Sequence, residues 1–174
     1  MYLIIGGTGR AGRLAARMLI DAGKPVRLLV RDPEKARAMG LSEAELVRGD
    51  VTRAETLSPA FEGVTGVFSA LNTLHPGAVH LREAVEYEGN RHLIAAARQA
   101  NARFVYLSVF EADQVTFPHF AVKARVEQLA RQAGVPFTFL RPVTWTETLL
   151  MGMQNGRGQI IGRQTNRQQF VSVL

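Results

Sequence analysis

A glycine-rich turn directly after the first apolar run constrains this chain most. The run Tyr2–Ile5 is typical of a short buried strand, and Arg13–Ile20 is typical of the start of a helix. The turn between them reads Gly-Gly-Thr-Gly-Arg-Ala-Gly over residues 6–12. Its glycines fit both G-x-G-x-x-G and the related G-x-x-G-x-x-G, through Gly6 or Gly7 followed by Gly9 and Gly12. A second strand ends near Val30, which completes the strand–turn–helix–strand setting that the motif requires.

Glycines at these positions have a physical use. They let the backbone turn sharply, bring N–H groups against a pyrophosphate and let helix and strand pack closely. The helix N-terminus adds partial positive charge for the anion. The turn therefore predicts a dinucleotide site, and the alternative is a tight turn without a ligand. The residues expected to contact the cofactor here are Gly6, Thr8, Gly9, Arg10, Ala11 and Gly12.

Composition excludes several classes of protein. Of 174 residues, 47% are hydrophobic and 21% charged, which suits a soluble domain with a sizeable core. No run approaches the roughly 18 apolar residues of a membrane span, and Met1 leads directly into the first strand without room for a signal peptide. We therefore expect a cytoplasmic protein without membrane contact. The absence of cysteine excludes disulfides and thiolate metal sites.

The net charge of +6 is compatible with nucleic acid or with an anionic cofactor and substrate. The arginines are dispersed along the chain, and aromatic residues make up only 7% of it. Neither a basic block nor a set of stacking platforms is visible, so nucleic acid is not the expected partner.

Strand-like and helix-like stretches alternate along the chain. After the first unit, strands are expected at 25–30, 45–48, 66–70, 104–108 and 137–140. Helices are expected at 32–39, 53–61, 80–100 and 118–133. Repeated βα units with short connections predict an α/β fold, a Rossmann-type doubly wound parallel sheet with helices on both faces in three layers. We expect residues 1–174 to form one domain.

The order of these motifs resembles the atypical short-chain dehydrogenase/reductases, in particular the NmrA-like group of NAD(P)-binding proteins. The resemblance rests on the turn at 6–12, Leu-Val-Arg at 29–31, Gly-Asp-Val at 49–51, Phe-Ser-Ala-Leu at 68–71, Asn90, Phe-Val-Tyr-Leu-Ser at 104–108, His119 with Lys123 and Glu127, and Leu-Arg-Pro at 140–142. It implies a Rossmann-type fold that binds NAD(P). The family contains both reductases and redox-sensing proteins.

The same resemblance implies that relatives continue beyond the point where this chain stops. The substrate lobe at the C-terminus is therefore expected to be largely missing. Trp145, Thr146, Thr148 and Leu149 would line the substrate side, with a core position as the equal alternative for Trp145. A missing lobe would leave apolar surface uncovered. We therefore expect the chain to form homo-oligomers.

The end of the second strand bears on the choice of cofactor. An acidic residue about 20 positions beyond the glycines would grip the ribose of NAD, whereas an arginine accommodates the 2′-phosphate of NADP. Arg31 stands 19 residues after Gly12, and Arg10 lies in the glycine turn. Asp32 competes, but Pro33 follows it, so it can instead cap a helix. We expect NADP rather than NAD.

Further cofactor contacts are implied by the family pattern at the carboxyl ends of later strands, where open α/β sheets bind ligands. These are Asp50 and Val51 beside the adenine, Ala70, Leu71 and Asn72 under the ribose and pyrophosphate, and Pro142 and Val143 along the nicotinamide. Asp50 can equally be a turn residue. We expect no metal site, because carboxylates and histidines do not cluster at ligand spacing.

The catalytic candidates are His119 and Lys123, which are four residues apart and so share one helix face. In typical short-chain dehydrogenases the corresponding pair is tyrosine and lysine; here Lys123 would bind the cofactor ribose and His119 would act as acid or base. A neighbouring ammonium lowers the pKa of an imidazole, so His119 can also be structural. Ser108 would be the catalytic serine that accompanies this pair, but it is poorly placed for that role. Glu127 is expected to pair with Lys123 or Arg131.

Two functions follow. One is an NADPH-dependent reductase of a small carbonyl or quinone substrate. The other is a non-catalytic NADP(H) sensor that signals to a partner protein, favoured by the missing tyrosine, serine and substrate lobe.

Overall fold

A computed structural model describes residues 1–74, 76–114, 117–145, 153–154, 157–158 and 170–171. Its centre is a parallel sheet of six strands in the order β3-β2-β1-β4-β5-β6. The strands are β1 (Tyr2–Ile5), β2 (Val26–Val30), β3 (Glu45–Arg48), β4 (Gly66–Ser69), β5 (Arg103–Leu107) and β6 (Phe137–Leu140). The predicted α/β architecture is confirmed, because this is the strand order of a Rossmann-type doubly wound sheet. The predicted Trp145 segment forms β7 (Thr144–Trp145), and Thr146, Thr148 and Leu149 lie outside the described residues.

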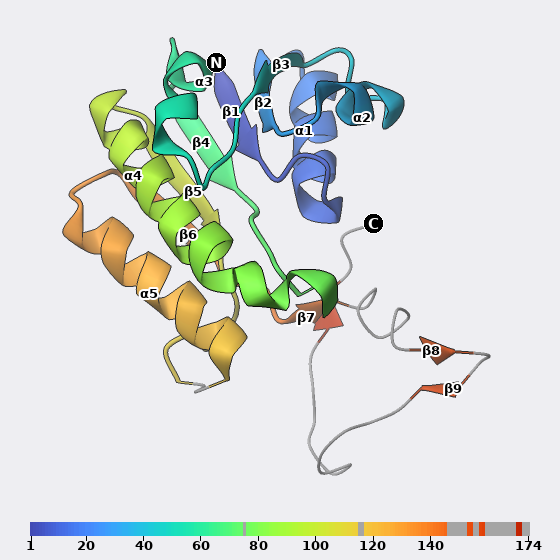
Figure 1. The fold of residues 1–174 in the computed structure, drawn as a ribbon, viewed down its shortest axis with the longest axis vertical. Helices are drawn as coiled ribbons and strands as arrows, with labels where there is room; N and C mark the ends of the chain where they lie inside the picture. Colours follow the sequence, from blue (N-terminus) through green and yellow to red (C-terminus); the bar gives the residue numbers. More distant parts are fainter. Residues whose placement is uncertain (75, 115–116, 146–152, 155–156, 159–169, 172–174) are drawn as a thin grey trace.

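Helices cover the sheet in two layers (Figure 1). On one side lie α1 (Arg10–Asp21) and α2 (Pro33–Ala38). On the other lie α4 (Gly89–Gln99) and α5 (Pro118–Gln132), together with the short η1 (Ala54–Thr56) and α3 (Ser58–Phe61). Outside the sheet, β7 pairs with β10 (Phe170–Val171) in parallel, and β8 (Met153–Gln154) pairs with β9 (Arg157–Gly158) in antiparallel fashion.

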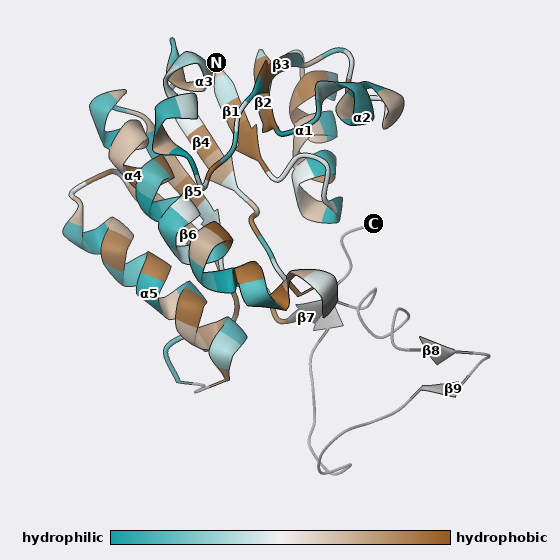
Figure 2. Cartoon of the chain, in the orientation of Figure 1, coloured by the Kyte–Doolittle hydropathy of each residue, from teal (hydrophilic) through white to brown (hydrophobic). Residues whose placement is uncertain are grey.

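Two apolar clusters hold the layers together. The larger one joins Leu3 and Ile5 of β1 and Phe104 of β5 to Leu93 of α4 and Val126 of α5. The smaller one packs β1 and β2 against Ala16 of α1 and Ala36 of α2. Successive residues of β1 alternate between the two clusters, because side chains of a strand point to opposite faces. Figure 2 shows the result as apolar strands between helices whose outward faces are hydrophilic.

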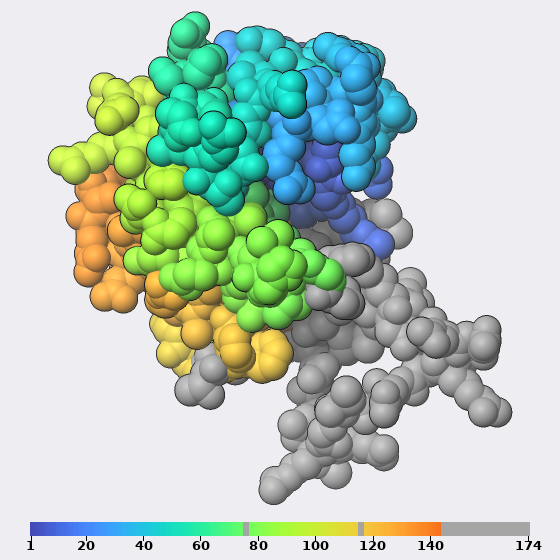
Figure 3. All heavy atoms as spheres, in the orientation of Figure 1, coloured from blue at the N-terminus to red at the C-terminus, as the bar shows by residue number. Residues whose placement is uncertain are grey.

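The helix expected at 80–100 differs from the prediction. It consists of the 3₁₀ turns of η2 (Pro76–Leu81), the π-helical η3 (Glu83–Glu88) and only then α4. In the π segment the buried Glu86 faces the sheet, and its carbonyl accepts a hydrogen bond from the Asn90 side chain. Such turns widen a helix locally and often occur at functional sites. Residues 76–99 form the green outer surface in Figure 3.

Candidate functional site

The glycine turn after β1 is closed so tightly that a Cβ does not fit at Gly6 or Gly12. Gly6 has a φ of +78°, the left-handed region that glycine adopts at least cost. The backbone N–H of Gly9 donates to the Gly6 carbonyl at 2.9 Å. A Cβ on Gly12 would lie 2.3 Å from that carbonyl oxygen, and one on Gly6 would lie 2.9 Å from the carbonyl oxygen of Ala70. The turn therefore brings the start of α1 directly against the ends of β1 and β4.

The N-terminus of α1 carries the features of an anion site. Gly9 is its N-cap residue, and among the described residues no side chain caps it and no acid lies in its first turn. The first N–H groups of a helix have no partner within the helix, and its dipole favours negative charge there. Thr8 and Ala11 are half-buried, while Arg10 is exposed. The residues present fit a pyrophosphate.

The end of β2 carries an exposed arginine and a helix-capping aspartate. Arg31 follows β2 directly and is exposed, as is Arg10. Asp32 is the N-cap residue of α2, and its carboxylate accepts a hydrogen bond from the Lys35 backbone N–H at 3.1 Å. The alternative interpretation of Asp32 as a helix cap is thereby confirmed.

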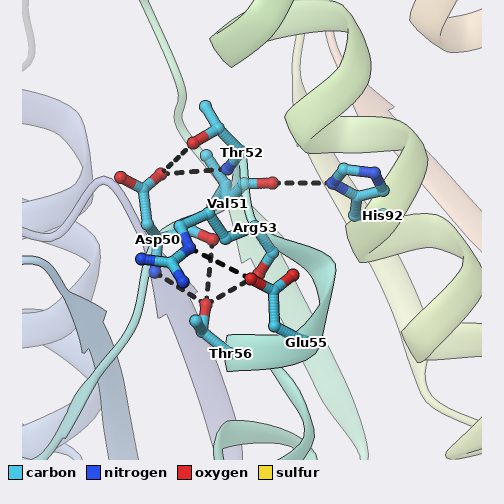
Figure 4. A network of polar contacts seen from close by, with 7 residues as sticks. All are labelled: Asp50, Val51, Thr52, Arg53, Glu55, Thr56 and His92. Atoms are coloured by element: carbon cyan, nitrogen blue, oxygen red, sulfur yellow. Dashed lines mark hydrogen bonds and ion pairs between the residues drawn. The ribbon is translucent and has the colours of Figure 1, made fainter.

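The turn after β3 is stiffened by a local polar network (Figure 4). The Asp50 carboxylate accepts from the backbone N–H of Thr52 at 2.9 Å and from its hydroxyl at 2.8 Å. The hydroxyl of Thr56 accepts from the Asp50 N–H at 3.0 Å. Asp50 therefore acts as a turn residue, the alternative left open by the sequence. The Val51 carbonyl lies 2.8 Å from Nδ1 of His92 on α4, a contact that sequence reasoning missed.

Apolar contacts join the ends of β3 and β4 at the first residue of α4. A Cβ on Gly89 would lie 2.9 Å from a methyl group of Val51 and 3.5 Å from one of Leu71. The structure thus brings together two side chains predicted beside the adenosine. The Ala70 N–H donates to the Ile5 carbonyl at 3.1 Å, and the exposed Asn72 accepts from the Leu74 N–H at 2.7 Å.

Lys123 lies inside the protein instead of in an open site. It is 3% exposed, its ammonium donates to the Leu71 carbonyl at 2.9 Å, and it lies 3.1 Å from Oε2 of Glu86. The ammonium also lies 5.0 Å from the centre of the Tyr106 ring. Burial lowers the pKa of Lys123, and the Glu86 carboxylate works against that shift.

Glu86 is the functional residue that sequence reasoning missed. It is fully buried, and its Oε1 accepts from both the backbone N–H and the hydroxyl of Thr73. Asn90, one turn further on, accepts from Ser69 at 2.6 Å. A signal existed: positions 86, 90, 93 and 97 follow the helical period, so Glu86 and Asn90 share the face of the buried Leu93.

His119 lies beside this carboxylate. It is 8% exposed, and its Nδ1 lies 4.0 Å from Oε2 of Glu86. Burial, reinforced by the charge of Lys123, lowers the pKa of His119 to about 4, although Glu86 opposes the shift. The imidazole is therefore neutral at pH 7 and cannot serve there as a ready proton donor.

A second buried carboxylate holds the end of β6. Glu127 is 1% exposed; Oε1 accepts from Nε of Arg141 at 2.8 Å and Oε2 from Arg131 at 3.3 Å. Of the two partners expected for Glu127, the one found is Arg131, while Lys123 pairs with Glu86. These bonds from arginine outweigh burial, so the pKa of Glu127 is lowered.

The Arg141 pair fixes the segment predicted to lie along the nicotinamide. Pro142 and Val143 follow Arg141 directly and are half-buried, and the Pro142 carbonyl accepts from the Phe110 N–H at 2.9 Å. Ser108, at the end of β5, is 5% exposed.

Metal ligands and membrane-spanning helices can be looked for only among the described residues. Among the described residues, no group of three or more histidines and carboxylates is placed to hold a metal ion. Within the same ranges, no helix has the length and hydropathy needed to span a bilayer.

Comparison with known proteins places this geometry in context. The photosystem II assembly factor Ycf39 of Trieres chinensis is 36% identical over 141 residues, which are 80% of this chain and 44% of that protein. The NAD(P)H azoreductase of Xenophilus azovorans is 31% identical over 156 residues, 88% of this chain and 51% of that protein. The chain spans about half the length of the curated relatives it matches.

A solved structure has the same fold. The triphenylmethane reductase of Citrobacter sp., crystallised with NADP(H), superposes with a TM-score of 0.70 at 26% identity, covering 84% of this chain and 50% of that one. The model of the NmrA-like family matches residues 2–161, most of the chain. Together with the six-stranded sheet and the glycine turn, this match establishes that the chain belongs to the NmrA-like family.

Proposed function

We propose that residues 1–174 form one NAD(P)H-binding domain of an oxidoreductase that uses NADPH to reduce a small quinone or carbonyl compound. The observation that carries this proposal is the glycine turn. Its backbone leaves no space for a Cβ at Gly12, and it ends at an N-terminus of α1 that, among the described residues, no side chain caps. A site of this shape accepts the phosphates of a dinucleotide.

Contacts to the rest of the cofactor extend from this turn along the carboxyl edge of the sheet. The 2′-phosphate of NADPH would meet Arg31 and Arg10, which are exposed residues, while the carboxylate of Asp32 is engaged at the start of α2. We propose that the adenosine lies against Val51 and Leu71. The remaining cofactor contacts in the proposal are Gly6, Thr8, Gly9, Ala11, Gly12, Asp50, Ala70, Asn72, Pro142 and Val143.

The protonation state of His119 favours quinones among the possible substrates. When bound, the nicotinamide supplies a hydride. A reduced simple carbonyl becomes a strongly basic alkoxide that needs a proton at once. A reduced quinone becomes a phenolate, which with a pKa of about 10 is stable enough to take its proton from water. Because His119 is neutral at pH 7, the site suits the second class of acceptor.

Relatives with reductase names support the enzyme over the non-catalytic sensor, which becomes the weaker hypothesis. They include the NAD(P)H azoreductase and the triphenylmethane reductase that was crystallised with NADP(H). Self-association stays a separate prediction. It rests on exposed apolar side chains such as Leu140 of β6, which is 45% exposed. Sedimentation of the chain as a clean monomer would contradict the predicted self-association.

The experiment is a turnover assay with the purified chain. NADPH oxidation is followed against a panel of benzoquinones, naphthoquinones and aldehydes. We expect oxidation with quinones and little with aldehydes. Tight NADPH binding without oxidation of any panel member would eliminate the reductase and leave the sensor.

A further inference from the structure

The carboxylate of Glu86 lies between Lys123 and His119. Its Oε1 is fully used, because it accepts from the backbone N–H of Thr73 at 2.8 Å and from the Thr73 hydroxyl. Its Oε2 lies 3.1 Å from the ammonium of Lys123 and 4.0 Å from Nδ1 of His119. One buried oxygen therefore faces two nitrogen atoms on the same face of α5.

One buried nitrogen in this group is unsatisfied. Within the described part of the chain, Nδ1 of His119 has no hydrogen-bond partner, and Oε2 of Glu86, which forms an ion pair with Lys123, accepts no other hydrogen bond. Leaving buried polar atoms unpaired is costly, and a small rotation of the imidazole would shorten the 4.0 Å gap to a hydrogen bond. An ionised carboxylate only accepts, so the hydrogen of that bond must sit on Nδ1.

We propose that Glu86 is a positioning residue that holds His119 in the tautomer with hydrogen on Nδ1, so that Nε2 accepts a hydrogen bond from a ligand hydroxyl. Nδ1 is buried, yet the His119 side chain keeps 10% exposure, so its exposed surface belongs to other atoms of the side chain. The inference rests on the proposed function for the identity of the ligand, but not for the tautomer.

This arrangement changes the role expected for Lys123, which the sequence predicted to bind the cofactor ribose. Lys123 is committed to Glu86 and to the Leu71 carbonyl, so it acts as the internal counter-ion. His119 is the more exposed member of the pair. The charged groups that act on it are Lys123 on its own helix, Glu86 on η3 and Arg82 just before η3. The hydroxyl that donates a hydrogen bond to Nε2 of His119 belongs either to the nicotinamide ribose or to the reduced substrate.

Nitrogen NMR of the ¹⁵N-histidine-labelled chain tests the tautomer directly. The chain has only four histidines, and His119→Gln assigns the resonance of interest. At pH 7 and without ligand we expect His119 to carry hydrogen on Nδ1 and a bare Nε2. Hydrogen on Nε2 in the wild-type chain would overturn the proposal, whether or not the chain binds NADPH.

The variant Glu86→Gln sharpens the test. Both Thr73 donors would hold the amide oxygen, which turns the amide NH₂ toward His119. The proposal then predicts that the tautomer switches to hydrogen on Nε2. Glu127→Gln is the matched control, since it alters an equally buried carboxylate on the same helix as His119 and should leave the tautomer unchanged. A folded Glu86→Gln chain with an unchanged tautomer would refute the role, and if it does not fold the wild-type spectrum decides.

Ligand titrations separate the two sources of the hydroxyl. A shift of Nε2 with NADP⁺, but not with adenosine 2′,5′-bisphosphate, would assign the hydroxyl to the nicotinamide ribose. A shift that appears only when a benzohydroquinone is added to the NADP⁺ complex would assign it to the product. If NADP⁺ binds and Nε2 responds to neither addition, the acceptor role is wrong.

Discussion

The substitution Gly12→Ala probes the close contact on which the cofactor site depends. A Cβ at this position would lie 2.3 Å from the oxygen and 2.6 Å from the carbon of the Gly6 carbonyl, and 3.0 Å from the Cα of Gly7. All three atoms belong to the backbone, so no side chain can rotate away. The turn itself must open.

The cost can be worked out from two opposing effects. Overpacking that shifts the backbone costs about 3 kcal/mol at the upper end of the usual range, which a 2.3 Å contact justifies. Alanine in a helix is worth about 1 kcal/mol more than glycine, which offsets part of this loss. We therefore expect the free energy of unfolding to fall by about 2 kcal/mol. Opening the turn also displaces the first N–H groups of α1, so NADPH affinity should fall by at least about tenfold.

Urea unfolding at an unchanged m-value and NADPH titration of the folded variant measure both effects. Gly134→Ala is a suitable control, because its φ of +68° costs stability while a Cβ meets no atom within 4 Å. This control should lose about 1 kcal/mol and bind NADPH normally. A Gly12→Ala chain with wild-type stability and affinity would show that the contact is not as close as described.

Three further predictions concern the edges of the site. Arg31→Asp should reverse the cofactor preference, and the affinity for NADPH should fall about tenfold or more, because a charge-assisted contact is worth about 1.5–3 kcal/mol. An unchanged preference in paired NADPH and NADH titrations would refute this explanation. Arg141→Met leaves Arg131 as the one arginine, among the described residues, that is paired with the buried Glu127. The free energy of unfolding, measured with urea, should fall by about 3 kcal/mol. A loss below about 1 kcal/mol would contradict the pairing. The folded-state pKa of His119, about 4, lies below the ordinary 6.5, so its contribution to stability is present above pH 6.5 and lost as the pH falls to 4. His119→Gln should flatten this part of the stability profile by about 3 kcal/mol, and an unchanged profile would argue against the shift.

Local sequence patterns predicted the fold because the spacing of apolar residues within each strand or helix shows which side of that element is buried. The alternation of short apolar runs with helical periods predicted the parallel sheet, and the glycine spacing located the turn between β1 and α1. The continuous helix at 80–100 was a wrong prediction, since periodicity alone does not reveal the π turn around the buried Glu86. That turn depends on contacts with Thr73 and Lys123, which come from other elements.

The sequence predicted where the turns of the candidate site lie, but it did not predict which buried charged side chains pair with one another. Spacing showed that His119 and Lys123 share a helix face, yet it could not show which carboxylate meets them. Glu127, one turn further along, was the natural partner by sequence distance, whereas the pairing with Glu86 spans 37 positions. Pairing across such separations depends on how η3 and α5 pack, which local patterns do not specify.

Titration of the purified wild-type chain with NADPH and NADH, followed by nicotinamide fluorescence, shows whether the glycine turn receives a dinucleotide. We expect saturable binding of NADPH, with NADH about tenfold weaker or more. We also expect adenosine 2′,5′-bisphosphate to compete, because the turn and Arg31 recognise the phosphates of the adenosine half. A folded chain that binds neither nucleotide would contradict the claim that the glycine turn receives a dinucleotide.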